Sequence, residues 1–457
     1  MPRKKPPVKV AFVSLGCSKN QIDSEMMLSH LYESGFEIVG DPSEADAVIV
    51  NTCGFISDAK RESIDTIHEM GALKKTGRLK KLVVTGCFAE RYREKILEDM
   101  PETDALLGVG SIHAIADILK KAFDGEKCAV FDSADACCLD GERILTTAPH
   151  TAYLRIAEGC NNRCTYCVIP SIRGRYRSRT MERIVEEAKM LEKEGVRELN
   201  LIAQDTSLYG ADLYGKLMLP ALLRRLAEET SIPWFRLFYC YPDKITDELI
   251  AEIRDNPRVL HYIDMPIQHI NDAVLKRMNR HGNRALIEGL IEKLRREIPD
   301  IVIRTTAIVG FPGETDEEFG ELLDFVETVR FGRFGAFAYS REEGTPAGDM
   351  PDQVDEDDKL DRYEALMTAQ AEISAAELRA CVGRVRTVLC DGFDEESGLY
   401  VGRDYANAPE IDGNVYFSAP RAVNAGEFVR VVLTDADEYD LYGELSEEGG
   451  EPSGKKK

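Results

Sequence analysis

The stretch YLRIAEGCNNRCTYC, residues 153–167, decides the fold of the central part of the chain. Its first half is a mainly apolar run typical of a buried strand, and Cys160, Cys164 and Cys167 follow directly in C-x3-C-x2-C spacing. Further strand-like runs alternate with helical patterns, namely ELNLIAQD, WFRLFYCY, YIDMPIQH, VIRTTAIVG and FGAFAYS. Six such units predict an open or partial barrel of parallel strands, with the cysteine loop at its functional edge.

The spacing of these three cysteines favours a metal cluster. Thiolates are soft ligands that suit iron-sulfur clusters or zinc. A structural zinc site usually takes four ligands from two cysteine pairs, and the sequence has no second C-x2-C. Three ligands instead leave one iron of a [4Fe-4S] cluster open to bind S-adenosylmethionine and pass it an electron. We therefore predict a radical S-adenosylmethionine enzyme, in which cleavage of that cofactor yields a 5'-deoxyadenosyl radical.

Three other cysteines, Cys17, Cys53 and Cys87, share one local context in residues 1–125. Each comes just after a predicted strand, in VAFVSLGC, AVIVNTC and LVVTGC, and a helix over residues 24–34 separates the first two. The carboxyl ends of parallel strands meet at one sheet edge, so these thiols are expected to gather there. Buried core cysteines are the alternative, but core residues lie within strands and not one step beyond them. The pattern predicts a second three-ligand cluster.

The predicted fold class is α/β, with a small all-β module at the C-terminal end. Short β-like runs with turns between them, GRVRTVLCDGF, GLYVGRD, NVYFSA and EFVRVVLTDA, indicate a minor barrel. The predicted boundaries are an N-terminal cluster domain at 1–125, a linker at 126–148, the barrel domain at 149–376, the β module at 377–446 and a disordered tail at 447–457.

Other polar or flexible groups at predicted strand ends are candidates for cofactor binding. VGFPGET, residues 309–315, has two glycines that permit close approach to a ligand, although a tight turn capped by Thr315 explains the same pattern. Gln204 and His269 also follow strands, where polar groups can contact a cofactor, and capping of the chain is an equal alternative. Tyr166, beside the third cysteine, packs either on an adenine or within its own loop. The candidate cofactor residues are Tyr166, Gln204, Gly310, Pro312 and Gly313.

A basic segment, PSIRGRYRSR, follows the cysteine loop at residues 170–179. Arg173, Arg175 and Arg177 are candidates for gripping a substrate, for balancing cluster charge or for contacting RNA. A solvated basic loop is the alternative reading of the same residues.

Composition sets the broad class of the protein. The chain has 457 residues, 44% hydrophobic and 30% charged, with a net charge of -23, so general nucleic-acid binding is disfavoured. The opening MPRKKPPVKVAFVSLGC has too short an apolar run for an export signal, and no stretch approaches the roughly 20 apolar residues that span a bilayer. We expect a cytoplasmic protein with no membrane partner, where clustered thiols are typical of metal or redox sites.

Five motifs together resemble the methylthiotransferases of the radical S-adenosylmethionine superfamily: LGCSKNQIDSE, VNTCGFI, VTGCFAER, EGCNNRCTYCVIPSIRGRYRSR and IVGFPGET. The resemblance covers nearly the whole chain. It implies an N-terminal cluster domain, a radical barrel and a C-terminal TRAM module, with two [4Fe-4S] clusters and S-adenosylmethionine as cofactors. It also implies that the N-terminal cluster holds the sulfur to be inserted and that a second S-adenosylmethionine provides the methyl group.

The motifs are most similar to the branch that modifies a ribosomal protein. That resemblance implies β-methylthiolation of an aspartate in small-subunit ribosomal protein twelve, an electron donor such as flavodoxin or ferredoxin, and an unknown sulfur donor. A tRNA adenosine methylthiotransferase is the alternative, and an iron-sulfur electron carrier or an RNA-binding protein is the non-enzymatic one. Residues 377–446 contain 14 acidic and 6 basic side chains, and this acidic module favours a basic protein target.

Overall fold

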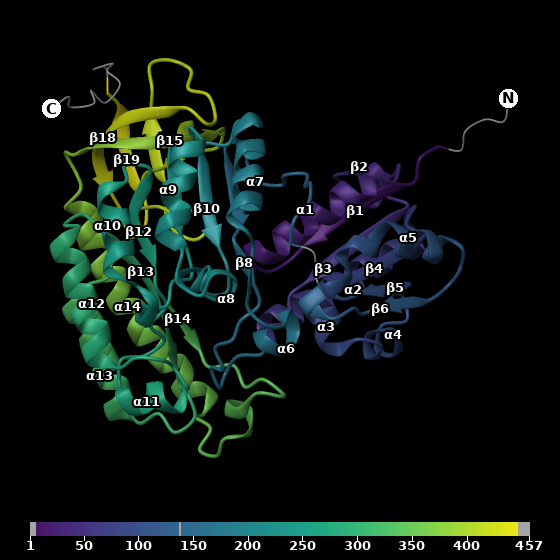
Figure 1. The fold of residues 1–457 in the computed structure, drawn as a ribbon, viewed down its shortest axis with the longest axis horizontal. Helices are drawn as coiled ribbons and strands as arrows, with labels where there is room; N and C mark the ends of the chain where they lie inside the picture. Colours follow the sequence, from purple (N-terminus) through teal and green to yellow (C-terminus); the bar gives the residue numbers. More distant parts are fainter. Residues whose placement is uncertain (1–5, 137–138, 447–457) are drawn as a thin grey trace.

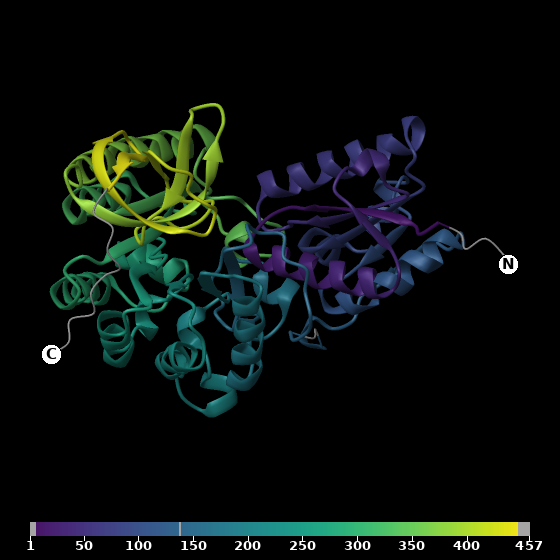
Figure 2. The same cartoon turned by 90° about the horizontal axis from the view of Figure 1, so that it is seen from above.

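The computed structural model describes residues 6–136 and 139–446 of the chain. An N-terminal α/β domain lies beside a second, larger α/β domain, and a small β-barrel packs against the second domain (Figure 1). The view from above shows the N-terminal domain on one side of the molecule and the β-barrel on the other (Figure 2). These parts confirm the predicted α/β fold with a C-terminal all-β barrel. The predicted disordered tail, residues 447–457, lies outside the described residues.

The N-terminal domain is built on a parallel sheet in the order β2-β1-β3-β4-β5-β6. Its strands are β1 (Lys9–Ser14), β2 (Glu37–Val39), β3 (Ala47–Thr52), β4 (Lys81–Gly86), β5 (Ala105–Leu107) and β6 (Cys128–Val130). Its helices, which cover both faces of the sheet (Figure 2), are α1 (Ser18–Glu33), α2 (Ser57–Thr76), α3 (Cys87–Tyr92), α4 (Lys95–Asp99) and α5 (Ile115–Phe123). β3 is buried along its whole length, as expected for a central parallel strand.

The predicted linker at 126–148 is wrong in its first part, because β6 lies inside it. β6 pairs in parallel with β5, with Ala105 opposite Cys128 and Leu107 opposite Val130, so the sheet continues past residue 125. The apolar triplet CAV is long enough to add an edge strand but too short to show a period in the sequence. Two residues of the same stretch, 137 and 138, lie outside the described residues.

The central domain is an open barrel of parallel strands in the order β14-β13-β12-β11-β10-β7, and it confirms the six predicted βα units. Its strands are β7 (Thr151–Arg155), β10 (Glu198–Ile202), β11 (Trp234–Leu237), β12 (Val259–Asp264), β13 (Val302–Val309) and β14 (Arg333–Ala338). The main helices are α7 (Met181–Lys193), α9 (Leu219–Glu229), α10 (Asp247–Asp255), α12 (Arg284–Glu297), α13 (Asp316–Val329) and α14 (Glu356–Arg379). Short elements near the cysteine loop and at the strand ends are β8 (Ala157–Glu158), α6 (Ile169–Arg173), β9 (Arg177–Ser178), α8 (Ala211–Tyr214) and α11 (Asp272–Arg277).

The C-terminal module is a closed barrel in the order β15-β16-β17-β19-β18. Its strands are β15 (Val385–Asp394), β16 (Leu399–Arg403), β17 (Val415–Ser418), β18 (Phe428–Ala436) and β19 (Leu441–Leu445). A buried ion pair and a hydrogen bond fasten it to the central domain, since Arg403 Nη1 lies 2.5 Å from Glu198 Oε2 and Tyr262 Oη donates to Asp412 Oδ2 at 2.8 Å. The module is therefore anchored on the central domain at defined side chains. Across residues 6–136 and 139–446, no helix combines the length and apolar character needed to cross a membrane.

Candidate functional site

Cys160, Cys164 and Cys167 lie in the loop between β8 and α6. Cys160 and Cys164 are buried and Cys167 is half-buried. Backbone hydrogen bonds shape the loop: Cys160 N donates to Gly174 O at 3.1 Å, and Cys167 N donates to Cys164 O at 3.1 Å. The Cys167 sulfur accepts from the backbone N–H of Ile169 at 3.5 Å. The structure thus holds the three thiols in one partly buried loop, which follows the carboxyl end of the first barrel strand, β7.

The electrostatics of this loop fit a cationic metal cluster. Burial, together with the charge of neighbouring Cys164, raises the pKa of Cys160 to about 11 and that of Cys167 to about 12. Such thiols ionise readily only when a positive charge is placed beside them, and a bound metal provides it. Arg280 supplies a fixed cation, because its Nη1 lies 4.0 Å from the Cys164 sulfur while its guanidinium stacks 4.1 Å above the Tyr241 ring.

Cys17, Cys53 and Cys87 follow the neighbouring strands β1, β3 and β4. Cys17 caps the start of α1, and Cys87 is the first residue of α3. A Cβ on Gly16, whose φ is +88°, would lie 2.8 Å from Cys53 Cβ, so the glycine lets the first two strand ends approach each other. Burial, together with the charges of the other two thiols, raises the pKa of Cys87 to about 12. The structure therefore brings these three thiols to one sheet edge.

Neither thiol set has the geometry of a single-ion site. Among the residues that the structure describes, no three His, Cys, Asp or Glu side chains converge closely enough to hold one metal ion. A four-iron cluster takes its thiolates at different irons, so it does not require three thiolates to converge on one ion.

Asn20, which the sequence reasoning missed, connects the N-terminal thiol set. Its Nδ2 donates to Leu15 O at 3.0 Å and to Thr52 O at 2.9 Å, and these carbonyls belong to the chain just before Cys17 and Cys53. Its Oδ1 lies 3.5 Å from the Cys87 sulfur, which donates to it. The only sequence signal is its place in CSKN, one turn into a helix that starts earlier than the predicted residue 24.

The three candidate substrate arginines have different surroundings. Arg173 is 3% exposed, and its guanidinium is fully engaged by Asn20, Asp23 and Glu158, so it is not available to a substrate. Arg177 is partly buried, and its Nη1 donates to Ala134 O at 2.6 Å. Arg175 alone of the three has an exposed side chain.

The candidate cofactor residues also differ from one another. Tyr166 packs beside Phe311 and Tyr339, and the buried Oε1 of Gln204 has no hydrogen-bond partner among the described residues. Pro312 is buried and Gly313 is half-buried. A Cβ on Gly310 would lie 2.2 Å from Lys359 Cγ, so this glycine makes room for Lys359.

The backbone N–H groups of the 309–315 turn are occupied within the protein. Glu314 accepts from Gly310 N at 3.0 Å and from Phe311 N at 3.3 Å, and Gly313 N donates to Asp352 O at 2.8 Å. The turn therefore caps and packs its own residues, which is the alternative that the sequence left open.

A Gly159→Ala substitution should disrupt the Cys160 loop. Gly159 has a φ of +77°, and an added Cβ would lie 2.0 Å from Arg175 O. We expect a loss of unfolding free energy on the order of 2 kcal/mol and reduced iron in the purified protein. Gly195→Ala is the matched control, because Gly195 has a φ of +98° and nothing lies within 4 Å of its added Cβ. Equal iron content and equal melting temperatures for the two variants would contradict the expectation.

His269 should make the protein less stable in acid. It follows β12, is fully buried, and its Nδ1 accepts from Asn271 N at 3.0 Å; burial lowers its pKa to about 3. Between that value and its ordinary pKa of 6.5 the unfolded chain binds a proton that the native state excludes. The unfolding free energy should therefore fall with falling pH, by at most about 1.4 kcal/mol per pH unit from this residue. Urea unfolding of wild type and His269→Gln at several pH values tests this, and a pH-independent difference between them would refute it.

An open barrel of six parallel strands, with three thiols in a loop at its carboxyl edge, defines the chain as a radical S-adenosylmethionine enzyme. Matching family descriptions agree with this class. They are "Radical SAM superfamily" over residues 154–326, "Uncharacterized protein family UPF0004" over residues 9–108 and "TRAM domain" over residues 382–445.

Within this class, the chain belongs to the family of ribosomal protein uS12 methylthiotransferases, RimO. It is 52% identical to the protein of that name from Thermoanaerobacter sp., over 95% of this chain and 99% of the relative. The proteins of the same name from Lachnoclostridium phytofermentans and Geobacter sulfurreducens are 50% and 48% identical, over 95% and 96% of this chain and 99% and 98% of their own lengths. The predicted methylthiotransferase family, and with it a transferase, is confirmed.

The solved structures support the fold. The radical S-adenosylmethionine methyltransferase TsrM from Kitasatospora setae, with cobalamin and a [4Fe-4S] cluster bound, is similar with a TM-score of 0.53 at 16% identity, over 75% of this chain and 74% of that chain. At this identity the likeness concerns the fold alone, and it agrees with the radical barrel.

Proposed function

We propose that the chain inserts sulfur into, and then methylates, the β-carbon of an aspartate of ribosomal protein uS12, the small-subunit protein twelve expected from the sequence. The name shared by relatives at 48% to 52% identity supports this substrate. The observation that carries the proposal is the pair of thiol sets, one in each α/β domain. Cys87 begins α3, and it packs against Val168 and Ile172 at α6, the helix that follows Cys167. Sulfur insertion needs two such centres in one active site.

In this proposal Cys160, Cys164 and Cys167 hold one [4Fe-4S] cluster, and a second cluster is held by Cys17, Cys53 and Cys87. When bound, the barrel cluster would supply the electron that cleaves S-adenosylmethionine, and the N-terminal cluster would hold the sulfur to be inserted. The burial of Cys160 and Cys164 limits the access of water to their thiols, and Arg280 offsets the negative charge of the thiolates. Each set leaves one ligand position for a small molecule.

Around the barrel cluster, we assign cofactor contacts to the groups that remain available. The buried Gln204 Oε1, which lacks a partner among the described residues, suits an N–H donor of the cofactor. Tyr166 offers an aromatic face beside the cysteines, and at Gly313 an added Cβ would come no nearer than 3.9 Å to a neighbouring side chain, that of Arg277. Arg175 is the arginine whose exposed side chain is free to reach a substrate.

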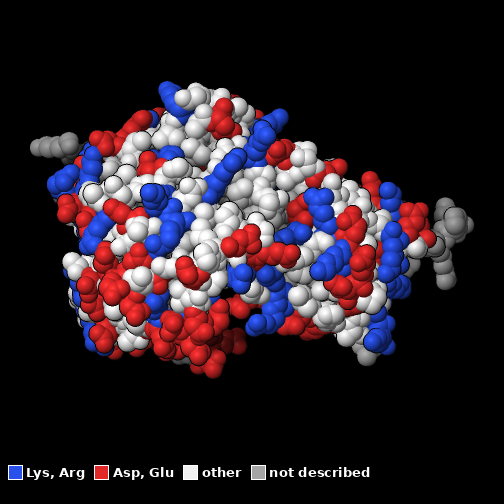
Figure 3. Space-filling model, turned by 90° about the horizontal axis from the view of Figure 1, so that it is seen from below, with Lys and Arg blue, Asp and Glu red and all other residues white. Residues whose placement is uncertain are grey.

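Charge supports a basic protein as the target. The chain carries -23 overall, and residues 377–446 are acidic. Seen from below, a dense patch of Asp and Glu covers part of the half of the molecule that holds the central domain (Figure 3). A hollow lies beside this patch, where that half meets the N-terminal domain, with Lys and Arg on its other side. Ribosomal proteins are basic, so this acidic face suits uS12 better than it suits tRNA.

The proposal also fixes the expected partners and compartment. A ribosomal substrate places the enzyme in the cytoplasm, on the ribosome or its small subunit. A low-potential electron donor such as flavodoxin or ferredoxin would supply the electrons, and the sulfur donor is an additional partner.

Comparison of uS12 and tRNA from a deletion strain tests the substrate. Mass spectrometry should show uS12 without its methylthio group, methylthio-adenosine in tRNA unchanged, and uS12 modification restored by the intact gene. Loss of methylthio-adenosine with uS12 unchanged would assign the tRNA alternative instead. Both pools unchanged would reject the proposed function.

A further inference from the structure

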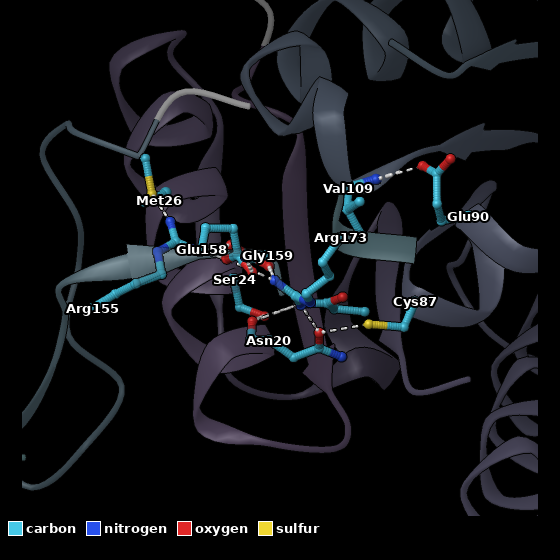
Figure 4. Close-up of polar contacts among 12 residues, drawn as sticks. Asn20, Ser24, Met26, Cys87, Glu90, Val109, Arg155, Glu158, Gly159 and Arg173 are labelled. Carbon is cyan, nitrogen blue, oxygen red and sulfur yellow. Dashed lines mark hydrogen bonds and ion pairs between the residues drawn. The ribbon is translucent and has the colours of Figure 1, made fainter. Parts of the chain in front are cut away.

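We infer that Asn20, Arg173 and Glu158 form a polar bridge between the two thiol sets, and that Asn20 and Arg173 are positioning residues that set the geometry between the two clusters. The inference rests on the proposed function, because it assumes that both sets hold clusters that act on one substrate. Figure 4 shows the bridge, with Arg173 between Asn20 and Glu158 and with Cys87 beside Asn20.

The first end of the bridge is Asn20, which is fully buried in α1. One side-chain amide contacts the chain next to all three N-terminal cysteines, through Leu15 O, Thr52 O and the Cys87 sulfur. Because both its donors and its acceptor are used, the amide has one orientation. Any movement of the Asn20 side chain therefore changes its contacts beside all three N-terminal cysteines.

The centre of the bridge is Arg173, the last residue of α6, which begins two residues after Cys167. Its Nη2 donates to Asn20 Oδ1 at 2.5 Å, and its Nη1 lies 3.0 Å from Asp23 Oδ2 and 3.1 Å from Glu158 Oε2. One planar guanidinium therefore contacts the N-terminal domain and the central domain together. Lysine has the charge but cannot reproduce this fork of donors.

The second end is Glu158, which precedes the Cys160 loop by one residue. Its Oε1 accepts from Gly159 N at 3.0 Å, and its Oε2 accepts from Arg155 Nη1 at 2.9 Å as well as from Arg173. Arg155 also reaches Asp23 Oδ1 of α1 at 2.6 Å. Two buried guanidiniums and two buried carboxylates thus close the interface beside both thiol sets.

The bridge has a consequence for the reaction rather than for cluster binding. Its polar groups contact the chain next to the cysteines, apart from Asn20 Oδ1, which also accepts from the Cys87 thiol. That S–H is lost when Cys87 binds a metal, whereas the bond from Arg173 to the same oxygen remains. Displacement of one reacting group by about 1 Å can lower a rate by about 100-fold. We therefore expect bridge variants to cleave S-adenosylmethionine and yet to deliver sulfur poorly.

The test compares Arg173→Lys with Arg179→Lys in the reconstituted full-length protein. Arg179 is also buried and ion-paired, but its guanidinium pairs with Asp140 and Glu187 and donates to Arg155 O, which all lie outside the N-terminal sheet and α1. Three quantities are measured for each protein: the iron content, the 5'-deoxyadenosine formed, and the methylthiolated uS12 formed per 5'-deoxyadenosine. The magnetic coupling between the two reduced clusters, seen in electron paramagnetic resonance, is the fourth.

For Arg173→Lys we expect unchanged iron, 5'-deoxyadenosine formation within about twofold of wild type, and at least a tenfold fall in product per 5'-deoxyadenosine, with altered magnetic coupling. Arg179→Lys should keep all four quantities. A wild-type product ratio and coupling in Arg173→Lys would overturn the inference, as would equal losses in both variants.

A second variant covers the case in which Arg173→Lys does not fold. Asn20→Asp keeps an oxygen for Arg173 and removes the two Nδ2 bonds to Leu15 and Thr52, so it should show the same fall in product ratio. Retention of the wild-type ratio would overturn the inference here too. Failure of the proposed function itself is visible in the wild-type protein, which would then hold about four irons in place of about eight or leave uS12 unmodified.

Discussion

Replacing Cys164 with alanine should abolish the cleavage of S-adenosylmethionine. The substitution removes the middle thiol of the Cys160 loop, leaving two ligands where a four-iron cluster needs three. We expect 5'-deoxyadenosine formation under dithionite to fall to background and the iron content to fall from about eight to about four per chain. Methylthiolated uS12 should not form, because no radical is produced.

Cys240→Ala is the matched control for this experiment. Cys240 is also a fully buried cysteine of the central domain, but it lies outside both thiol sets. It should keep the iron content and the cleavage activity. If Cys164→Ala cleaved S-adenosylmethionine at the rate of Cys240→Ala, the cysteine loop would have no part in forming the radical.

Replacing Cys17, Cys53 and Cys87 together with alanine should separate radical formation from sulfur insertion. This variant should retain about four irons and continue to form 5'-deoxyadenosine, because the barrel loop is untouched. Methylthiolated uS12 should be undetectable, because the N-terminal set holds the sulfur in the proposed reaction. Mass spectrometry of uS12 and iron analysis on the same sample measure both effects.

Cys128→Ala provides the control in the N-terminal domain, since Cys128 lies on the edge strand β6 and is only partly buried. It should retain about eight irons and full product formation. A triple variant that kept about eight irons, or that still produced methylthiolated uS12, would show that the second cluster is elsewhere or absent.

Most of the fold could be predicted because buried parallel strands are continuous apolar runs. The strands before the cysteines, β1, β3 and β4, each have six residues, and all three were predicted from the sequence. The strands β2, β5 and β6 have three residues each and were missed. A three-residue run is too short to show the alternation or the length that identifies a strand, so the N-terminal domain was predicted to end too early.

The start of α1 was missed for a different reason. The predicted helix began at residue 24, whereas α1 begins at Ser18, because the segment SKNQID is polar and has no apolar period. In the structure Lys19, Asn20 and Asp23 are buried against the central domain and the thiol set. A helix segment that buries polar residues at an interface between domains lacks the apolar period by which a helix is predicted.

The positions of the cysteines could be predicted, but the contacts between the two sets could not. Each cysteine follows a strand, so strand prediction alone placed it at a sheet edge. The contact of Arg173 with Asn20 joins residues 153 positions apart and depends on how two domains dock. No local pattern carries that information, and Arg173 was accordingly predicted to contact substrate.

The most direct measurement of the central claim uses uS12 with deuterium at the β-carbon of its modified aspartate. The reconstituted enzyme is incubated with this uS12 in ribosomal subunits, S-adenosylmethionine, sulfide and dithionite, and mass spectrometry follows both products. The proposed reaction predicts deuterium in 5'-deoxyadenosine and a methylthio group on the same aspartate. Deuterium-free 5'-deoxyadenosine together with unmodified uS12 would contradict it.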